Sequence, residues 1–156
     1  MRIYLIAVGQ KMPAWVAAGW GEFAKRMPRD CALQLVELAA GRRGRKADLA
    51  RALREEGERM LAAIPSGTHV VALDVTGRGW DTPKLANRLE QWRAGGSDVV
   101  LLVGGPEGLD PRCLARADER WSLSPLTFPH MLVRVIVAEQ IYRAWSLLSG
   151  HPYHRE

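Results

Sequence analysis

This sequence has few cysteines and no long apolar run. It contains two cysteines, Cys31 and Cys113, in separate segments, which excludes a disulfide framework and a paired-thiolate metal site. No apolar run approaches the roughly 20 residues that a membrane-spanning helix needs. We therefore expect no metal ion, no membrane partner and a protein of the reducing cytoplasm, in which each cysteine is a small buried apolar residue.

The amino terminus lacks the features of a secretory signal. The segment MRIYLIAVGQK has one arginine and a short apolar run without a small-residue cleavage site, so it is interpreted as a buried first strand. The chain has 156 residues, 47% of them hydrophobic and 25% charged, which is typical of one folded domain. No internal repeat, low-complexity segment or linker divides it, and we expect a single domain over residues 1–156.

Acidic residues are too few to balance the basic ones. Lys and Arg total 22 against 17 Asp and Glu, which gives a formal net charge of +5 and a pI near 9.7. A pI this high is a weak indication of nucleic-acid binding. Basic residues gather in GRRGRK at 41–46, which is either a solvated loop or a flexible arm that contacts phosphates. The candidate phosphate contacts are Arg42, Arg43, Arg45 and Lys46.

Short apolar runs alternate with helical patterns along the chain. Strands are predicted at 2–8, 33–38, 69–75, 98–104 and 121–124. The first, third and fourth are nearly continuous in β-branched residues and leucine, which is typical of strands buried on both faces. Apolar residues at helical spacing predict helices that start near Pro13, after the basic segment, at Thr82–Pro83 and at Asp110–Pro111. This alternation indicates an α/β fold with a mostly parallel sheet flanked by helices.

The last predicted helix, from 132 to 148, has apolar residues nearly all the way round. A helix of this kind is buried on more than one side. In so small a domain one side packs on the sheet and the other is left for a second subunit, so we expect a homodimer with this helix in the interface. Sedimentation as a monomer at micromolar concentration would contradict that expectation. Gly150 is predicted to end the helix.

Three strand ends carry unusual segments, and ligands of open α/β sheets bind beyond the carboxyl ends of strands. The segments are LDVTGRGW at 73–80, GGPEG at 104–108 and LSPLTFPH at 123–130. GGPEG matches neither the dinucleotide-binding nor the P-loop pattern, and it is either a tight turn or a close approach of backbone to a ligand. In LSPLTFPH, two prolines stiffen a nearly apolar loop. We expect free amides at Leu126, Thr127 and Phe128, which suit a flat heteroaromatic ring; the alternative is a plain rigid connection.

The sequence ends on HPYHRE, at 151–156, with side chains suited to proton transfer and anion contact. Two histidines make a poor metal site, and from these residues alone a frayed charged terminus is the alternative. Glu139 and Arg143 are four residues apart, which predicts an intrahelical ion pair, with contact of Arg143 to RNA as the alternative. His69 and His130 are expected to be structural.

Three motifs taken together resemble one family. GGPEGL at 104–109, LSPLTFPHMLVRVIVAEQIYRAW at 123–145 and HPYHR at 151–155 are similar in order and spacing to the RlmH (YbeA) family. Its members are SPOUT-class methyltransferases that act on N3 of a pseudouridine in large-subunit (23S) ribosomal RNA. The resemblance begins at AVGQKMPAWV, 7–16, and covers essentially the whole chain. Pro125 stands at a position that varies in the family.

The resemblance implies an α/β fold with a C-terminal trefoil knot, a rare exception to the rule that chains do not thread loops. It also implies a homodimer built on the last helix, S-adenosylmethionine as cofactor, and 23S rRNA within the assembled ribosome as substrate. Our hypothesis for the tail follows from its side-chain chemistry. His154 takes the N3 proton, Arg155 contacts a ring oxygen or phosphate, and Tyr153 stacks on the base or hydrogen-bonds to it. The implied cofactor contacts are Leu73, Gly104, Gly105, Leu123, Ser124, Pro125, Leu126, Thr127 and Phe128.

Two other functions stay open on the sequence. One is a SPOUT methyltransferase that acts on tRNA, and the HPYHR tail favours the ribosomal target over it. The other is a non-enzymatic ribosome- or RNA-binding protein that uses the same basic loop. Saturable binding of S-adenosylmethionine would separate an enzyme from this second alternative.

Overall fold

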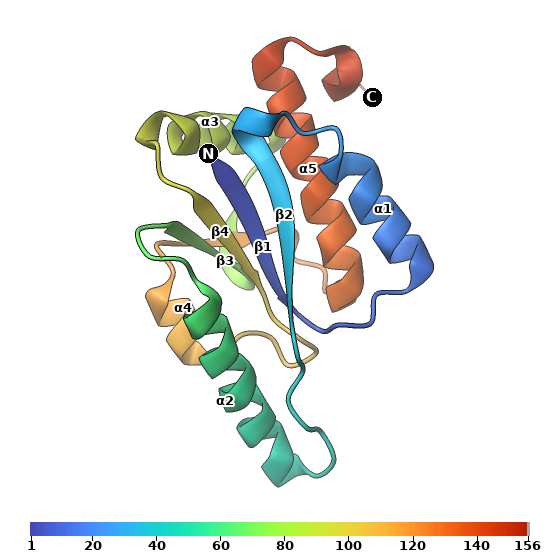
Figure 1. Ribbon diagram of the computed structural model, residues 1–156, viewed down its shortest axis with the longest axis vertical. Helices are drawn as coiled ribbons and strands as arrows, with labels where there is room; N and C mark the ends of the chain where they lie inside the picture. The colour runs from blue at the N-terminus through green and yellow to red at the C-terminus, as the bar shows by residue number, and fades with distance from the viewer. Residues whose placement is uncertain (156) are drawn as a thin grey trace.

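The protein alternates strands and helices throughout (Figure 1). The computed structural model describes residues 1–155, and for Lys46 and Ala47 it describes the backbone only. The strands are β1 (Arg2–Val8), β2 (Ala32–Leu38), β3 (His69–Gly79), β4 (Val99–Val103) and β5 (Glu119–Ser122). The helices are α1 (Ala14–Ala24), α2 (Lys46–Ala63), α3 (Thr82–Gly95), α4 (Pro111–Arg116) and α5 (His130–Ser149). Two short 3₁₀ turns, η1 (Arg29–Cys31) and η2 (Pro152–Arg155), complete the order.

The five strands form one parallel sheet in the order β2-β1-β4-β3-β5. Every residue of β4 is buried, and so is most of β1, which explains their continuous apolar sequences. The predicted α/β class with a parallel sheet is therefore confirmed. The trefoil knot stays a prediction.

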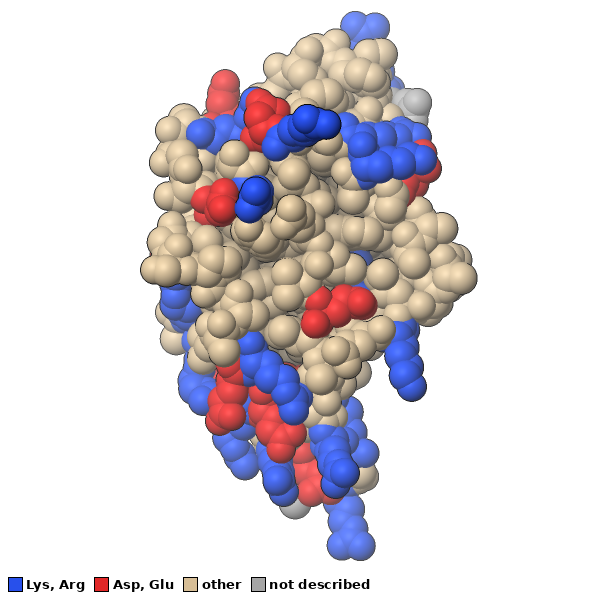
Figure 2. All heavy atoms as spheres, in the orientation of Figure 1, with Lys and Arg blue, Asp and Glu red and all other residues tan. Residues whose placement is uncertain are grey.

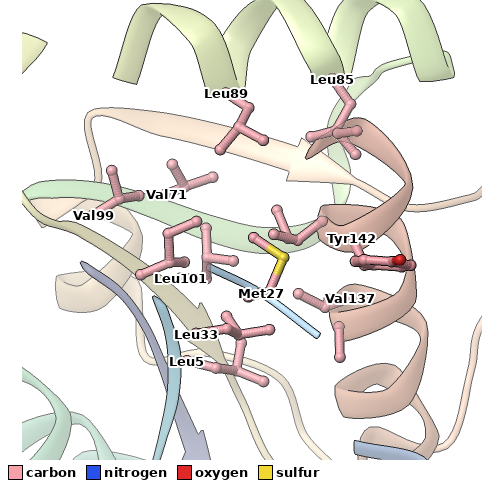
Figure 3. Close-up of a cluster of buried hydrophobic side chains, with 14 of the residues drawn as sticks. Leu5, Met27, Leu33, Val71, Leu85, Leu89, Val99, Leu101, Val137 and Tyr142 are labelled. Carbon is pink, nitrogen blue, oxygen red and sulfur yellow. The ribbon is translucent and has the colours of Figure 1, made fainter. Parts of the chain in front are cut away.

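Helices cover both faces of the sheet (Figure 1). On one face, α1, α3 and α5 enclose the larger apolar core, in which Leu85 and Leu89 of α3 lie over Val71 and Val99, and Val137 of α5 faces the sheet (Figure 3). On the other face, α2 and α4 enclose a smaller core around Met60 and Cys113. Both cysteines are free and buried, as expected.

Most element ends fall where the sequence places them. Asp110 Oδ1 accepts a hydrogen bond from the amide of Arg112 (2.8 Å) and begins α4 as predicted. Gly150 ends α5 with a φ of 72°, a left-handed conformation that glycine adopts freely. The predicted cap of α3 is wrong by one residue, because Asp81 accepts from the amide of Lys84 (2.9 Å) and Thr82 lies inside the helix.

The last strand also differs from its prediction at 121–124. It ends at Ser122, and Leu123 and Ser124 already belong to the loop that leads to α5. Ser122 Oγ donates to the carbonyl of Ser124 (3.1 Å), so the chain turns away from the sheet two residues earlier than expected. The proline-rich segment is therefore entirely free to line the carboxyl edge of the sheet.

Helix α5 is apolar on more faces than a single chain buries. Val137, Ala138, Ile141 and Ala144 are fully buried against the rest of the chain. Further apolar residues of the helix are only half buried: Met131, Leu132, Val133, Val135, Ile136, Trp145, Leu147 and Leu148. Across the described residues, no helix is long and apolar enough to span a membrane.

Candidate functional site

A cavity of about 410 Å³ lies beyond the ends of β4 and β5, beside residues 73–75 of β3, and at the start of α5. The prediction that the third strand ends at 75 is wrong, because β3 continues to Gly79 after a break in its pairing with β5 between Leu73 and Arg78. The walls of the cavity come from residues 73–75, 103–109, 123–124 and 126–128, with Leu114, Trp121, and His130 and Val133 of α5. The three strand-end segments singled out in the sequence are thus brought together in one place. This is the edge of a parallel sheet at which ligands are expected.

Glycine is required in the turn that follows β4, because two stretches of backbone lie very close together there. Gly105 and Gly108 form an isolated antiparallel bridge, and Gly108 has a φ of 81°. A Cβ on Gly104 would lie 2.3 Å from the carbonyl oxygen of Gly108. Residues 104–108 therefore form a tight turn that also presents bare backbone to the cavity.

The loop before α5 supplies apolar surface and backbone donors. Leu126 is 70% exposed, which is unusual for a large apolar side chain, and it lies on the cavity wall. The expectation of a free amide at Leu126 is wrong, because that amide donates to Ser124 Oγ (3.0 Å). The amides of Thr127 and Phe128 have no partner among the described residues, so they stay available to a ligand.

Three ionisable residues of the cavity wall, Asp74, Glu107 and His130, were not predicted as site residues. The guanidinium of Arg43 hydrogen-bonds Glu107 and lowers the pKa of its carboxyl, which is therefore ionised at neutral pH. Burial lowers the pKa of the His130 ring, and the cations Arg134 and Arg43 lower it further, so the ring is neutral at pH 7. Glu107 belongs to the GGPEG motif at 104–108, and this position in the sequence could have identified it as a site residue.

Eight of the nine expected cofactor contacts lie on the cavity wall. They are Leu73, Gly104, Gly105, Leu123, Ser124, Leu126, Thr127 and Phe128. Pro125 is exposed and does not line the cavity. Its effect on the site is confined to the shape of the loop, since it fixes one backbone angle.

The C-terminal tail lies at the opposite end of α5 from the cavity (Figure 1). Tyr153 folds back onto the helix, where its hydroxyl donates to Glu139 Oε1 (2.9 Å) and its ring packs 4.8 Å from that of Tyr142. Helix α5 has 20 residues and is therefore about 30 Å long. A single chain thus does not bring Tyr153, His154 and Arg155 to its own cavity.

The basic residues occupy different environments. Arg42 and Arg45 are exposed, whereas Arg43 pairs with Glu56 and Glu107. The side chain of Lys46 lies outside the described part of the chain. Figure 2 shows basic and acidic side chains interleaved at the lower end of the molecule, where α2 begins.

The remaining polar predictions concern ion pairs and histidines. The predicted pair between Arg143 and Glu139 is confirmed at 2.6 Å. His69 begins β3, and its Nε2 lies 2.6 Å from Glu119 Oε2 of β5, in keeping with the structural role expected of it. His130 was also expected to be structural, yet it lines the cavity. Within residues 1–155, no group of three or more His, Cys, Asp and Glu side chains is placed to hold a metal ion.

Comparison with known proteins identifies relatives over the whole length. A family model described as "Predicted SPOUT methyltransferase" matches residues 1–154. The chain is 61% identical over 155 residues to "Ribosomal RNA large subunit methyltransferase H" of Marinomonas sp. (strain MWYL1), which covers 99% of this chain and 100% of that protein.

Solved structures share the fold at low sequence identity. A putative methylase family protein from Neisseria gonorrhoeae aligns with a TM-score of 0.54 and 14% identity over 90% of this chain and 81% of its own. A probable methylase family protein from Haemophilus influenzae Rd KW20 aligns with a TM-score of 0.55 and 12% identity over 97% of this chain and 69% of its own. At these identities the similarity shows the fold alone.

Proposed function

The chain belongs to the predicted SPOUT methyltransferase family, and on this premise we propose that it methylates N3 of a pseudouridine in 23S ribosomal RNA within assembled ribosomes. Its 61% identity to a large-subunit rRNA methyltransferase supports an rRNA substrate. S-adenosylmethionine is the methyl donor, and the reaction takes place in the cytoplasm, where ribosomes are found.

The observation that carries the proposal is the cavity beside β3 at the ends of β4 and β5. Its apolar residues, such as Leu73, Leu123 and Phe128, suit the faces of an adenine ring, and the amides of Thr127 and Phe128 suit its ring nitrogens. The carboxylate of Asp74, which lines the cavity, suits a ligand that carries positive charge. These residues fit S-adenosylmethionine, which supplies a methyl group already activated on a sulfonium.

The protein's main task is alignment of the base with that methyl group. Good alignment alone lowers a barrier by roughly 7–11 kcal/mol. The imide N3 carries a proton at neutral pH, so a base must remove it. We assign removal of this proton to His154. Contact with a ring oxygen or phosphate is assigned to Arg155, and stacking on the base to Tyr153.

The tail reaches a cavity only if two chains associate. The half-buried apolar residues of α5 offer a second packing face to another copy of the helix. If two α5 helices pack antiparallel, the carboxyl end of one lies beside the amino end of the other, where the cavity opens. Each active site is then composed of one subunit's cavity and the partner subunit's tail.

RNA contact is assigned to the exposed basic residues Arg42 and Arg45, together with Lys46. Phosphate contacts supply affinity without sequence specificity, and they make binding strongly salt-dependent. A domain of this size has no separate RNA-recognition module, so specificity comes from the shape of the assembled ribosomal site. Protein-free rRNA is therefore expected to be a poor substrate, and its efficient methylation would contradict this assignment.

The proposal is tested by transfer of labelled methyl from S-adenosylmethionine to ribosomes that lack this modification, followed by identification of the labelled nucleoside. Label in N3-methylpseudouridine of the large subunit is the expected result. Label in tRNA would move the function to the tRNA-modifying alternative. Saturable binding to ribosomes without binding of S-adenosylmethionine would instead indicate a non-enzymatic ribosome-binding protein.

The anchoring of Tyr153 by Glu139 gives a further prediction. Glu139→Gln weakens the hydrogen bond to the Tyr153 hydroxyl and the pair with Arg143, so the tail loses its fixed position. We expect kcat to fall about 10-fold, in line with loss of a charged hydrogen bond, while binding of S-adenosylmethionine is unchanged. Steady-state kinetics on unmodified ribosomes measure this. Glu55→Gln, which weakens the exposed pairs with Arg51 and Arg59 on α2, is the control, and an equal loss in both variants would contradict the anchoring.

A further inference from the structure

One arginine connects the basic loop to the wall of the cavity. Arg43 Nε donates to Glu107 Oε2 (2.8 Å), and its Nη2 lies 2.6 Å from the same oxygen. On its other side, Nη1 lies 2.6 Å from Glu56 Oε2. Arg43 and Glu107 are 64 residues apart in the sequence, so this bridge is a tertiary contact between two segments that are distant along the chain.

The Glu56 side of the bridge is rigid. Glu56 is only 2% exposed, and its Oε2 also accepts the amide of Gly41 (2.9 Å). Arg43 Nη1 donates back to the carbonyl of Gly41 (3.1 Å). The guanidinium is therefore fixed from two directions, because a buried carboxylate keeps its cation and the backbone of its own loop holds it in place.

The other side of the bridge sits directly against the cavity loop. A Cβ on Gly105 would lie 3.1 Å from Arg43 Nη2 and 3.3 Å from Val8 Cγ1, so the guanidinium packs against the turn 104–108. Glu107 at the tip of that turn lines the cavity. Its only ion pair within the described residues is the one with Arg43.

We propose that Arg43 is a positioning residue of the cofactor cavity, which holds the turn 104–108 in its binding shape through Glu107, and is not a phosphate contact. The inference rests on the proposed function only in taking the cavity to bind S-adenosylmethionine. Two carboxylates already neutralise the guanidinium, so a phosphate would have to displace them at an electrostatic cost. Arg42 and Arg45 are the cations of the loop left to face RNA, and the bridge keeps them next to the cavity.

Backbone hydrogen exchange of residues 104–108 tests the positioning without any ligand. Glu107→Gln is the decisive variant, because it loosens the turn and leaves the Arg43–Glu56 pair intact. We expect exchange of this segment to quicken at least ~5-fold in Glu107→Gln and in Arg43→Gln, as the loss of a charged hydrogen bond implies. Arg51→Gln removes the same charge from an exposed pair with Glu55 on α2, and it should leave the segment unchanged. Unchanged exchange in Glu107→Gln overturns the proposal.

A double-mutant cycle on S-adenosylmethionine binding separates positioning from direct contact. Glu107→Gln and Arg43→Gln are each expected to weaken binding ~5-fold or more. The double variant is expected to bind no more weakly than the single variant with the larger loss. In turnover, the Michaelis constant for S-adenosylmethionine should rise, whereas that for ribosomes stays within about twofold. Additive losses would mean that Glu107 acts on the ligand without Arg43, and a rise confined to the ribosome constant would return Arg43 to phosphate contact. Either result overturns the proposal, whereas a wild type that binds no S-adenosylmethionine would instead refute the proposed function.

Arg43→Lys provides the rescue test. A lysine ammonium restores the charge but has no planar fork, so it does not hold Glu56 and Glu107 at once. We expect stability near that of the wild type, because the buried Glu56 keeps a cation, and exchange of residues 104–108 as fast as in Arg43→Gln. Wild-type exchange in Arg43→Lys would show that charge alone suffices, and it would overturn the assignment of the bridging geometry.

Discussion

Deletion of residues 151–156 should reduce methyl transfer to ribosomes about 1,000-fold and leave binding of S-adenosylmethionine within about twofold. The tail carries the residues assigned to proton removal and base contact, and a positioned acid–base group contributes roughly 10²–10⁴-fold to a rate. The tail follows the far end of α5, whose 20 residues span about 30 Å, and none of its described residues lines the cavity, so the deletion leaves the walls of that cavity intact. Single-turnover transfer and calorimetric titration measure the two quantities.

Point variants separate a catalytic effect of the deletion from an effect on packing. The tail covers part of the aromatic group that Phe23 and Tyr142 form with Tyr153, and its deletion exposes those rings. His154→Gln removes the proposed base and keeps the packing, so it should lose activity about 100-fold at unchanged thermal stability. Tyr153→Phe keeps the ring and loses the hydroxyl contact with Glu139. If the deletion variant retains nearly full activity, the tail has no catalytic part.

Mixing two inactive variants tests whether the tail acts on the partner's cavity. A subunit with a damaged cavity still has a tail, and a truncated subunit still has a cavity. Their mixed dimer contains one complete site if the tail works across the interface, and none if it works within its own chain. Recovered activity on mixing is the expected result, and its absence despite demonstrated exchange of subunits would place the tail's action within one chain.

The position of the cavity follows from local features of the sequence. Continuous apolar runs at β1 and β4 predict buried parallel strands, and in such a sheet ligands bind beyond the carboxyl ends. The glycines of 104–108 and the prolines of 123–130 stand at those ends, so eight of nine expected contacts lie on one wall. Each of these inferences depends on neighbours within a few residues along the chain.

The contacts that escaped prediction depend on residues far apart in the sequence. Arg43 was expected to contact phosphate because its neighbours are basic, but its partners come from α2 and from the turn after β4. His130 was expected to be structural, yet the start of α5 faces the cavity. Likewise, no sequence pattern shows that Tyr153 folds back onto Glu139, in the middle of α5. Such pairings are set by tertiary packing, which residue spacing does not encode.

Gly104→Ala should weaken binding of S-adenosylmethionine about 100-fold. The new Cβ would lie 2.3 Å from the carbonyl oxygen of Gly108 and 2.4 Å from its carbon, and backbone atoms have no rotamer to escape into. The turn 104–108 must therefore open, and forced displacements of this kind cost roughly 1–3 kcal/mol or more, which corresponds to about 5–150-fold or more in affinity. Calorimetric titration measures the dissociation constant.

Gly79→Ala is the matched control for this substitution. Gly79 ends β3, and a Cβ there meets no atom within 4 Å, so the same methyl group should change binding by less than about twofold. Thermal unfolding of both variants distinguishes a displaced turn from a lost fold, because β4 itself ends at Val103 and stays buried. If Gly104→Ala is folded and binds S-adenosylmethionine as tightly as the wild type, the turn does not touch the cofactor. The methyl donor must then bind at a place other than this cavity.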